Sequence, residues 1–306
     1  TNISGIGNVL STEVFVNGDD AMLLAGIALL IVGLAFKVAV VPFHFWTPDV
    51  YQGAPTPVTS FMASVGKFAA FAALLRVVAT ALPSRAEDWR PVIWVLAILS
   101  VVVGSVLAVV QTDVKRMLAY SSISHAGFMM IGIESIGHSG DVEGLPATLL
   151  YLMIYSVLVI GTFTVVSLVT RTGDNGSDIG SFRGLGKERP ALALAMTVFL
   201  LAQAGMPLTS GFIAKFGVIK AAAANESYAI AIIAMVASVI AALLYLRIMI
   251  SMWLSDEESG DDKREAIRVP YSAGLVVAGS AFFTLLVGVW PSWLIDASQA
   301  ALQLAK

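Results

Sequence analysis

The chain has 306 residues, of which 58% are hydrophobic and 13% charged, with a net charge of −3 and no cysteine. A soluble domain carries about a quarter charged residues, so this composition excludes a soluble globular protein. The lack of cysteine excludes disulfides, thiolate metal sites and cysteine-bound iron–sulfur clusters. Repeated apolar runs of roughly 20 residues match the thickness of a bilayer and predict an all-α, polytopic membrane helical bundle.

Residues 1–20 contain no signal-peptide pattern, and we expect an extracytoplasmic loop or partial segment of a longer protein. A final segment, residues 291–306, is too short and polar to span and is predicted to lie in the interface, with Trp290 and Trp293 at headgroup depth. Eight candidate spans lie between them: Ala21–Val41, Val58–Leu82, Pro91–Val110, Val114–Ile136, Leu145–Thr170, Pro190–Lys220, Tyr228–Leu254 and Tyr271–Val289.

Basic residues are unevenly divided between the two sides of the predicted membrane. The loops after the third, fifth and seventh spans hold nine, against four on the other side. The positive-inside rule places the nine in the cytoplasm, so both chain ends are predicted to be extracytoplasmic. The nine are Lys115, Arg116, Arg171, Arg183, Lys187, Arg189, Lys263, Arg264 and Arg268, and the four are Arg85, Arg90, Lys220 and Lys306.

Charged residues inside the predicted spans are all basic, because Asp113 and Glu134 occur only at span ends. A charge at the centre of a membrane helix costs about 2.5–3.5 kcal/mol on insertion scales, so it normally pairs with an acid or lines a hydrated path. The counter-charges are therefore expected from chain that is not present, from another subunit or from water. The five basic residues are Lys37, Lys67, Arg76, Lys215 and Arg247.

Two of these lysines lie beside prolines that break their helices: Lys37 precedes Pro42, and Lys215 follows Pro207. Non-helical backbone at membrane depth survives only where it lines a cavity or is buried in protein. We expect the first span to continue past its break, with residues 44–55 forming a short second half and a cytoplasmic turn.

The two broken spans are five apart and run in opposite directions, which predicts inverted repeats. Residues 21–82 would end the first repeat, residues 91–254 would form the second, and residues 271–306 would add the final span and interfacial helix.

Lys67 lies near the middle of the second span and His125 about halfway along the fourth. Burial in an apolar bundle favours the neutral form of an amine, and histidine ordinarily titrates near neutral pH. Lys37, Lys67, His125 and Lys215 are therefore candidates for passing protons with water between them.

Structural roles are the alternatives to these assignments. A lysine or arginine near a span end usually reaches the interface, which is the expectation for Arg76 and Arg247. His125 is alternatively a structural hydrogen-bond partner, as is expected of His44, and His138 is expected to be a loop residue.

Other kinds of site are excluded. Gly180–Lys187 resembles a phosphate loop but lacks its glycine spacing, so we expect no bound nucleotide. Ser124 and His125 have no acidic partner for a nucleophilic triad, and three scattered histidines predict no metal site. The acidic residues 255–263 are predicted to form a solvated loop, and nothing indicates binding to nucleic acid.

Three segments resemble a known family: FKVAVVPFHFWTPDVYQGAPTPVTSFM, QTDVKRMLAYSSISHAG and LAQAGMPLTSGFIAKF. They are similar to the antiporter-like subunits of proton-pumping NADH:quinone oxidoreductase, respiratory complex I. TPDVYQGAPTP, with Lys215 rather than glutamate in the second broken helix, most resembles the subunit N branch and its mitochondrial and chloroplast relatives. The resemblance covers about residues 21–290 and implies the last eight helices of a fourteen-helix fold.

The resemblance also implies roles for four residues. Lys37 matches the broken-helix lysine of the first unit, and a glutamate upstream of Thr1 would be its partner. Lys67 matches a lysine on the central axis, His125 the bridging histidine, and Lys215 the lysine that gates the exit half-channel.

By the same resemblance, the chain translocates protons while quinone is reduced elsewhere in the complex. It would carry no cofactor, with FMN, iron–sulfur clusters and quinone in partner subunits. Its partners would be other complex I membrane subunits and the lipid of the bacterial inner membrane. One alternative is a subunit of a multisubunit sodium/proton antiporter, which shares the fold. A passive assembly scaffold is another, and would tolerate leucine at Lys37, Lys67 and Lys215.

Overall fold

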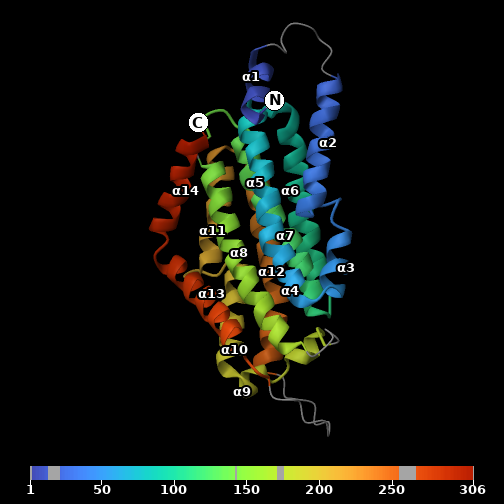
Figure 1. The fold of residues 1–306 in the computed structure, drawn as a ribbon, viewed down its shortest axis with the longest axis vertical. Coiled ribbons are helices and arrows are strands. Elements are labelled where there is room, and N and C mark those ends of the chain that lie inside the picture. Colours follow the sequence, from blue (N-terminus) through green and yellow to red (C-terminus); the bar gives the residue numbers. More distant parts are fainter. Residues whose placement is uncertain (1, 13–20, 142, 171–175, 255–266, 306) are drawn as a thin grey trace.

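The structure, a computed structural model, describes residues 2–12, 21–141, 143–170, 176–254 and 267–305. The regular elements of these ranges are helices, and most of them run along one long axis (Figure 1). The predicted all-α bundle is confirmed. The acidic residues 255–263 lie outside the described residues, as do Arg171, Lys263, Arg264 and Lys306.

Long apolar segments form most of the spans with nearly the expected bounds. Helices α7 (Val114–Ile136), α12 (Tyr228–Leu254) and α13 (Tyr271–Val289) have the predicted ends, and α8 covers Gly144–Val169. Within the described ranges, six helical segments could cross a membrane by length and composition: Ala21–Val38, Thr56–Ala81, Pro83–Val109, Gly144–Val169, Tyr228–Leu254 and Tyr271–Val289.

Two spans begin earlier than the sequence indicated. Helix α6 (Ala86–Val109) starts before Pro91, which lies inside its N-terminal part. The second span is a continuous run of α4 (Thr56–Phe61), a π-helical turn η1 (Met62–Gly66), α5 (Lys67–Arg76) and a second π-helical turn η2 (Val77–Ala81).

Residues 1–20, expected to be a loop or a partial segment, contain the helix α1 (Ile3–Thr12), which packs on η2. Leu10 is buried, and a Cβ on Gly7 would lie 2.4 Å from the Thr80 carbonyl oxygen. The short helix therefore forms because one face packs on the bundle.

Helix α7 is the centre of the bundle, and all its residues except Arg116, Tyr120 and Ile136 are buried. It packs most extensively against α6, and also against α3, α8 and α11. Glycine permits the close approach: a Cβ on Gly104 of α6 would lie 2.5 Å from the Ser124 backbone nitrogen. Small residues at such contacts are the usual means of packing membrane helices closely.

The two predicted broken helices are present. Helix α2 (Ala21–Val38) ends in a turn that leads to α3 (Trp46–Gly53), and α10 (Pro190–Ala204) ends in a turn that leads to α11 (Ser210–Ala224). Figure 1 shows α2 descending to mid-height and α10 rising to mid-height, so the two breaks are approached from opposite ends. The assignment of residues 21–82 and 91–254 to separate repeats stays a prediction.

Short elements complete the two ends and the outer side of the bundle. The 3₁₀ turn η3 (Pro83–Arg85) precedes α6, while η4 (Ile179–Phe182) and α9 (Leu185–Glu188) lie between α8 and α10. Helix α14 (Ser292–Ala305) packs along α8, and its Leu294 is buried (Figure 1). Its predicted interfacial position stays a prediction.

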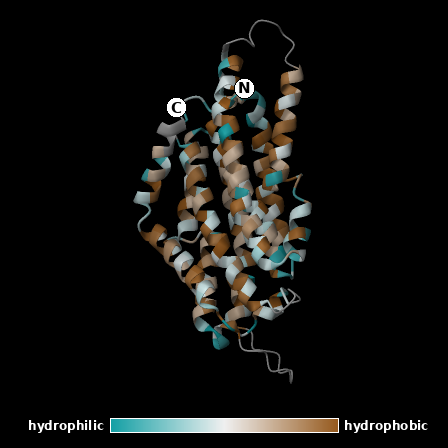
Figure 2. Cartoon of the chain, in the orientation of Figure 1, coloured by the Kyte–Doolittle hydropathy of each residue, from teal (hydrophilic) through white to brown (hydrophobic). Residues whose placement is uncertain are grey.

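The outer surface along the helices is apolar. Figure 2 shows hydrophobic residues along the length of the bundle and several hydrophilic ones at its ends. Helix α12, for example, exposes Ile232, Val239 and Ile250. Large exposed apolar surfaces mark contact with lipid or with other proteins, which agrees with a membrane bundle.

We expect Gly104→Val to destabilise the bundle by about 1–3 kcal/mol or more, because overpacking would force α6 away from α7. The matched control is Gly279→Val in α13, where a Cβ would meet no atom within 4 Å. Thermal unfolding of the purified protein in detergent checks this. Equal unfolding temperatures for the two variants would contradict the close α6–α7 contact.

Candidate functional site

The first helix break is held by side chains that satisfy freed backbone groups. Ala39 adopts φ 61°, which ends α2. The Val41 N–H donates to Ser100 Oγ of α6 at 2.9 Å, and the Trp46 indole N–H donates to the Phe36 carbonyl oxygen at 3.0 Å. Unpaired carbonyls at a helix end need such partners, especially away from bulk water. The turn that contains Pro42 is therefore stabilised by specific hydrogen bonds from neighbouring side chains.

Lys37 lies in the last turn of α2, and its side chain is exposed on the outer side of the described bundle. The structure does not bring it together with the other three predicted carriers. The glutamate partner that the resemblance implies would belong to chain outside this sequence, and it stays a prediction.

Lys67 is buried, at 2% exposure, and begins α5 directly after the π-helical turn η1. Its Nζ donates to the Ser122 carbonyl oxygen of α7 at 2.7 Å. Single π-helical turns are frequent at functional sites because they re-aim neighbouring side chains. Here the amine of the second span reaches the central helix.

His125 lies at the middle of α7 between two tyrosine hydroxyls. Its Nδ1 is 2.8 Å from Tyr151 Oη of α8, and its Nε2 is 3.1 Å from Tyr245 Oη of α12. Tyr245 Oη is also 2.6 Å from Ser121 Oγ. Both ring nitrogens therefore have a partner that can donate or accept a proton.

A second hydroxyl pair lies next to the first. Tyr155 Oη donates to Ser122 Oγ at 2.8 Å, and the carbonyl of the same serine accepts from Lys67. The Tyr155 ring centroid is 5.0 Å from that of His125. Serine and tyrosine hydroxyls thus occupy the space between the buried amine and the histidine.

Lys215 lies at the second helix break, at 6% exposure. Its Nζ donates to the Ala204 carbonyl oxygen at the end of α10 (3.1 Å) and to Ser238 Oγ of α12 (2.9 Å). It also lies 4.9 Å from the centroid of the Phe128 ring, a cation–π distance. The break supplies the free carbonyl that receives the amine.

Glycine shapes this second break. Gly205 has φ 89°, and a Cβ there would lie 2.9 Å from Lys215 Cδ. A Cβ on Gly211 would lie 1.8 Å from the Ala202 carbonyl oxygen. Pro207 lies in the intervening turn, whose Leu208 carbonyl faces Gly288 of α13. Lys215, the turn and α13 can therefore pack this closely only because these three positions are glycines.

Unpaired polar atoms gather at the breaks. Among the described residues, His44 Nδ1 and Thr47 Oγ1 at the first break and Ser210 Oγ at the second are buried without a hydrogen-bond partner. Buried polar atoms of this kind usually bind water. The His44 side chain also has a hydrogen bond with the Pro42 backbone, which agrees with the expected structural role.

A small cavity adjoins the histidine. Its volume is about 10 Å³, and it lies between His125, Tyr151, Tyr155 and the Gly211–Ala214 turn of α11. That is about the space that one water molecule needs. It separates His125 from the helix that carries Lys215.

Several basic residues assigned to loops or interfaces have specific partners. Lys115 is buried, and its Nζ donates to the Ala54 carbonyl oxygen at the end of α3 (2.6 Å). Arg116 forms an ion pair with Asp49 of α3 at 2.6 Å. Arg247 donates to carbonyls at the end of α6, at Val109 and Gln111, and its expected reach to the interface stays a prediction. Lys115 and Arg247 therefore bind helix C-termini, where carbonyls are free, while Arg116 binds a carboxylate.

Two other predictions can be placed. Arg76 is exposed on α5, where it can reach the interface. His138 follows the end of α7 as predicted, but it is not a free loop residue, because it contacts Arg90 and Glu134.

Sequence reasoning missed the tyrosines. Tyr151 and Tyr155 are four residues apart, a spacing that places both on one face of α8. Tyr245 is a polar aromatic in a mostly apolar span, and buried tyrosine hydroxyls normally have a partner. These signals indicate a polar contact but do not say which residue receives it.

A family model described as NADH:quinone oxidoreductase/Mrp antiporter, TM, matches residues 1–241. NADH-quinone oxidoreductase subunit N of Mycobacterium tuberculosis is 47% identical over 292 residues, covering 94% of this chain and 54% of the relative. NADH-quinone oxidoreductase subunit N 3 of Streptomyces griseus is 46% identical over 284 residues, covering 92% and 50%. The chain spans about half the length of these curated relatives.

Two solved structures have the same arrangement of helices. A chain of respiratory complex I from Thermus thermophilus with bound aureothin matches with a TM-score of 0.78 and 33% identity, covering 96% of this chain and 64% of that one. A chain of the Mrp complex from Dietzia sp. matches with a TM-score of 0.81 and 22% identity, covering 98% and 61%. The second likeness shows the fold alone.

Gly205→Ala should destabilise the protein by about 1–2 kcal/mol, because a Cβ is unfavourable at positive φ, and it should also displace Lys215. Gly217→Ala in α11 is the matched control, since a Cβ there would meet Ala147 Cβ at an ordinary 3.6 Å. Thermal unfolding in detergent measures the difference. A Gly205→Ala protein as stable as the control would contradict the described turn.

Proposed function

The chain belongs to the family of membrane subunits shared by NADH:quinone oxidoreductases and Mrp antiporters, and from this we propose that it translocates protons in NADH:quinone oxidoreductase. Protons would move along Lys67, His125 and Lys215, while quinone is reduced elsewhere in the complex. Lys37 would be a further carrier at the first break. The catalytic role is therefore proton transfer, with no redox centre in this chain.

The observation that carries the proposal is the burial of two amines without a carboxylate. Among the described residues, Lys67 and Lys215 contact only carbonyl and hydroxyl oxygens and, for Lys215, an aromatic ring. A purely structural amine at this depth would be costly. An amine that gives up its proton in part of a cycle needs acceptors that suit both of its forms, and hydroxyl groups are of this kind.

Water is expected to complete the path. The unpaired atoms at both breaks and the cavity beside His125 are places where polar groups lack protein partners. Water in these places would connect hydroxyls that are too far apart to bond directly.

Electrostatic interaction gives a reason why the protonation states of neighbouring proton carriers are coupled. Two charges about 8 Å apart interact by about 2 kcal/mol at an effective dielectric of 20. That energy exceeds the change that shifts a protonation equilibrium tenfold. Charge movement at one carrier would therefore change the protonation of the next.

The proposed setting follows from the relatives' names and from the apolar helices. The chain is a membrane subunit, and we place it in a bacterial inner membrane with both described ends on the extracytoplasmic side. FMN, iron–sulfur clusters and quinone would be bound by partner subunits, and other membrane subunits of the complex would cover part of its apolar surface.

A sodium/proton antiporter subunit is the second candidate, because the Mrp chain shares the fold. The 46–47% identity to subunit N favours the first. Purification of the native assembly discriminates between them. Flavin and iron–sulfur subunits in the assembly would support the oxidoreductase, and small membrane subunits without redox proteins would support the antiporter.

Lys67→Ala and Lys215→Ala should each lower proton pumping and coupled quinone reduction, by about tenfold, since each removes a proton carrier. Pumping is measured with the assembled enzyme in liposomes. Arg76→Ala is the matched control, because this residue lies on the same helix as Lys67 but is exposed. Undiminished pumping by both lysine variants would reject the role and favour a passive scaffold.

Tyr245→Phe should slow pumping by about tenfold, because it removes the hydroxyl that joins His125 to Ser121 and keeps the ring. Tyr228→Phe, at the exposed start of the same helix, is its control. The same liposome assay compares the two. Identical rates would show that this hydroxyl has only a structural role.

A further inference from the structure

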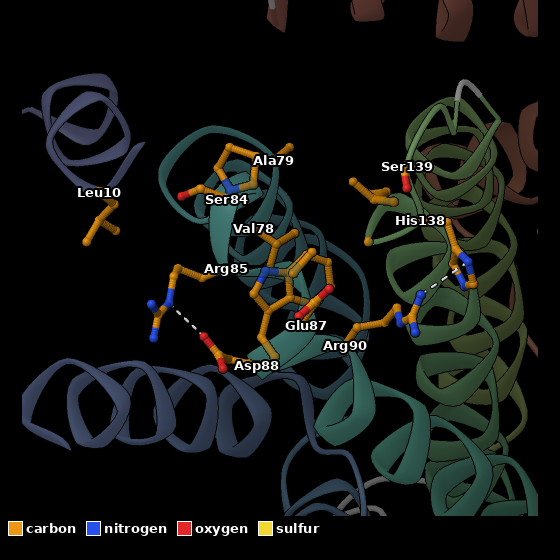
Figure 3. Close-up of a pocket in the computed structure, with 15 residues that line it drawn as sticks. Leu10, Val78, Ala79, Ser84, Arg85, Glu87, Asp88, Arg90, His138 and Ser139 are labelled. Atoms are coloured by element: carbon orange, nitrogen blue, oxygen red, sulfur yellow. Dashed lines mark hydrogen bonds and ion pairs between the residues drawn. The ribbon is translucent and has the colours of Figure 1, made fainter. Parts of the chain in front are cut away.

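A second group of titratable side chains lies away from the lysine–histidine site, at the upper end of the molecule in Figure 1. There a cavity of about 840 Å³ lies between α1, the start of α6 and the end of α7. Arg85, Glu87 and Asp88 line it, together with Arg90 and His138 (Figure 3). Glu87 and the neighbouring Ser84 are exposed, so the cavity opens to the surface.

Glu134 lies behind the lining residues Arg90 and His138. It is the only buried acidic side chain in the part of the chain that the structure describes. Its Oε1 is 3.0 Å from His138 Nε2, and both carboxylate oxygens accept from Ser227 Oγ at 3.3 Å. Arg90 Nε is 4.0 Å away. A buried ionisable residue in a membrane bundle is a candidate functional site by default.

The hydrogen bonds fix the tautomer of His138. Arg90 Nη1 lies 3.2 Å from His138 Nδ1, and arginine can only donate, so Nδ1 accepts and carries no proton. A neutral imidazole has its single proton on the other nitrogen, and Nε2–H therefore donates to Glu134. Figure 3 shows the Arg90–His138 contact at the wall of the cavity.

A proton that arrives at Nδ1 must displace Arg90. The N–H bond forms on the ring as an O–H bond of hydronium breaks, and water remains in the cavity. His138 then carries a positive charge that repels Arg90, while its contact with Glu134 becomes an ion pair. The other charged groups that line the cavity are Arg85, which pairs with Asp88 at 2.6 Å, and Glu87.

Arg90 has room to respond. Its side chain is 37% exposed, and it lies over Gly137, where a Cβ would come within 3.0 Å of its Cδ. The carboxylates of Glu87 and Asp88 line the same cavity, so a displaced guanidinium has acceptors within it.

The group is also placed on the helices that carry the proposed proton carriers. Glu134 follows His125 on α7 by nine residues, a rise of about 14 Å. Ser227 lies in the turn that follows α11, the helix of Lys215. The cluster therefore lies at the ends of α7 and α11, at the upper surface of the molecule.

We propose that Glu134 and His138 form a proton-exchange site at this surface, through which the chain exchanges protons with water in the cavity, and that Arg90 is its movable counter-charge. The proposal rests on the proposed function, since it concerns the route of the same protons. Its ligand is hydronium or water.

The functional test uses Glu134→Gln and His138→Gln in the assembled enzyme, reconstituted in liposomes. Each variant should pump at least about tenfold more slowly, because it removes a proton-exchanging group. The matched control is Glu143→Gln, which breaks a 2.7 Å ion pair with Lys220 at the same end but outside the cavity lining. If all three variants pump equally, the cluster is a structural ion pair and the proposal fails.

A second measurement does not depend on pumping. Structures of the assembled enzyme at about pH 5 and about pH 8.5 bracket the range in which histidine titrates. We expect Arg90 to contact His138 at the higher pH and to leave it at the lower. An unchanged contact at both pH values would overturn the proposal even if Lys67 and Lys215 prove essential. Movement of Arg90 in an enzyme whose lysine variants pump normally would retain the site and reject the lysine route.

Discussion

A buried ammonium group needs oxygen atoms around it, and this requirement explains much of the bundle. An intact helix uses its carbonyls internally and offers few to a neighbour. The break after Ala204 frees a carbonyl, and Lys215 binds it. Lys67 is aimed by a π-helical turn at the Ser122 carbonyl instead. The second break and Lys215 therefore occur together because each satisfies the other, whereas Lys67 binds a carbonyl within an intact helix.

The same requirement explains why α7 is polar and yet central. Its serines and His125 would be costly against lipid, so they are surrounded by α6, α8, α11 and α12. Close packing at Gly104 brings α6 against this helix, while tyrosines from α8 and α12 supply the hydroxyls. The hydrophobic spans then form the outside of the bundle, where lipid or other subunits cover them.

The sequence predicted the helical spans well because apolar length and flanking charge are local signals. It also predicted both breaks, since a proline near a lysine within an apolar run is visible in one stretch of chain. It could not predict the partners of Arg247 or Lys115, because a carbonyl at the end of a distant helix leaves no mark in the sequence. The helix at residues 3–12 was missed for a related reason, since its packing on η2 is a long-range contact.

The placement of the four predicted carriers shows the same difference between what the sequence predicts and what only the folded structure reveals. Lys67, His125 and Lys215 are buried where the spans meet, as their depth along each helix suggested. Lys37 has a similar depth but faces outward from the described helices, because depth does not determine which face of a helix a residue occupies. The tyrosines needed three-dimensional information, since only the assembled bundle brings α8 and α12 to the two sides of one imidazole.

The position of His125 between two hydroxyls has a consequence for timing. A neutral imidazole donates from one nitrogen and accepts at the other. The hydrogen bonds from Tyr151 through His125 and Tyr245 to Ser121 can therefore all donate in one direction along the row or all in the opposite direction. Passage of one proton along it reverses every O–H and N–H in the row. The groups must then rotate back before a second proton can follow in the same direction. Until they do, the reversed hydrogen bonds of the row prevent another transfer in that direction.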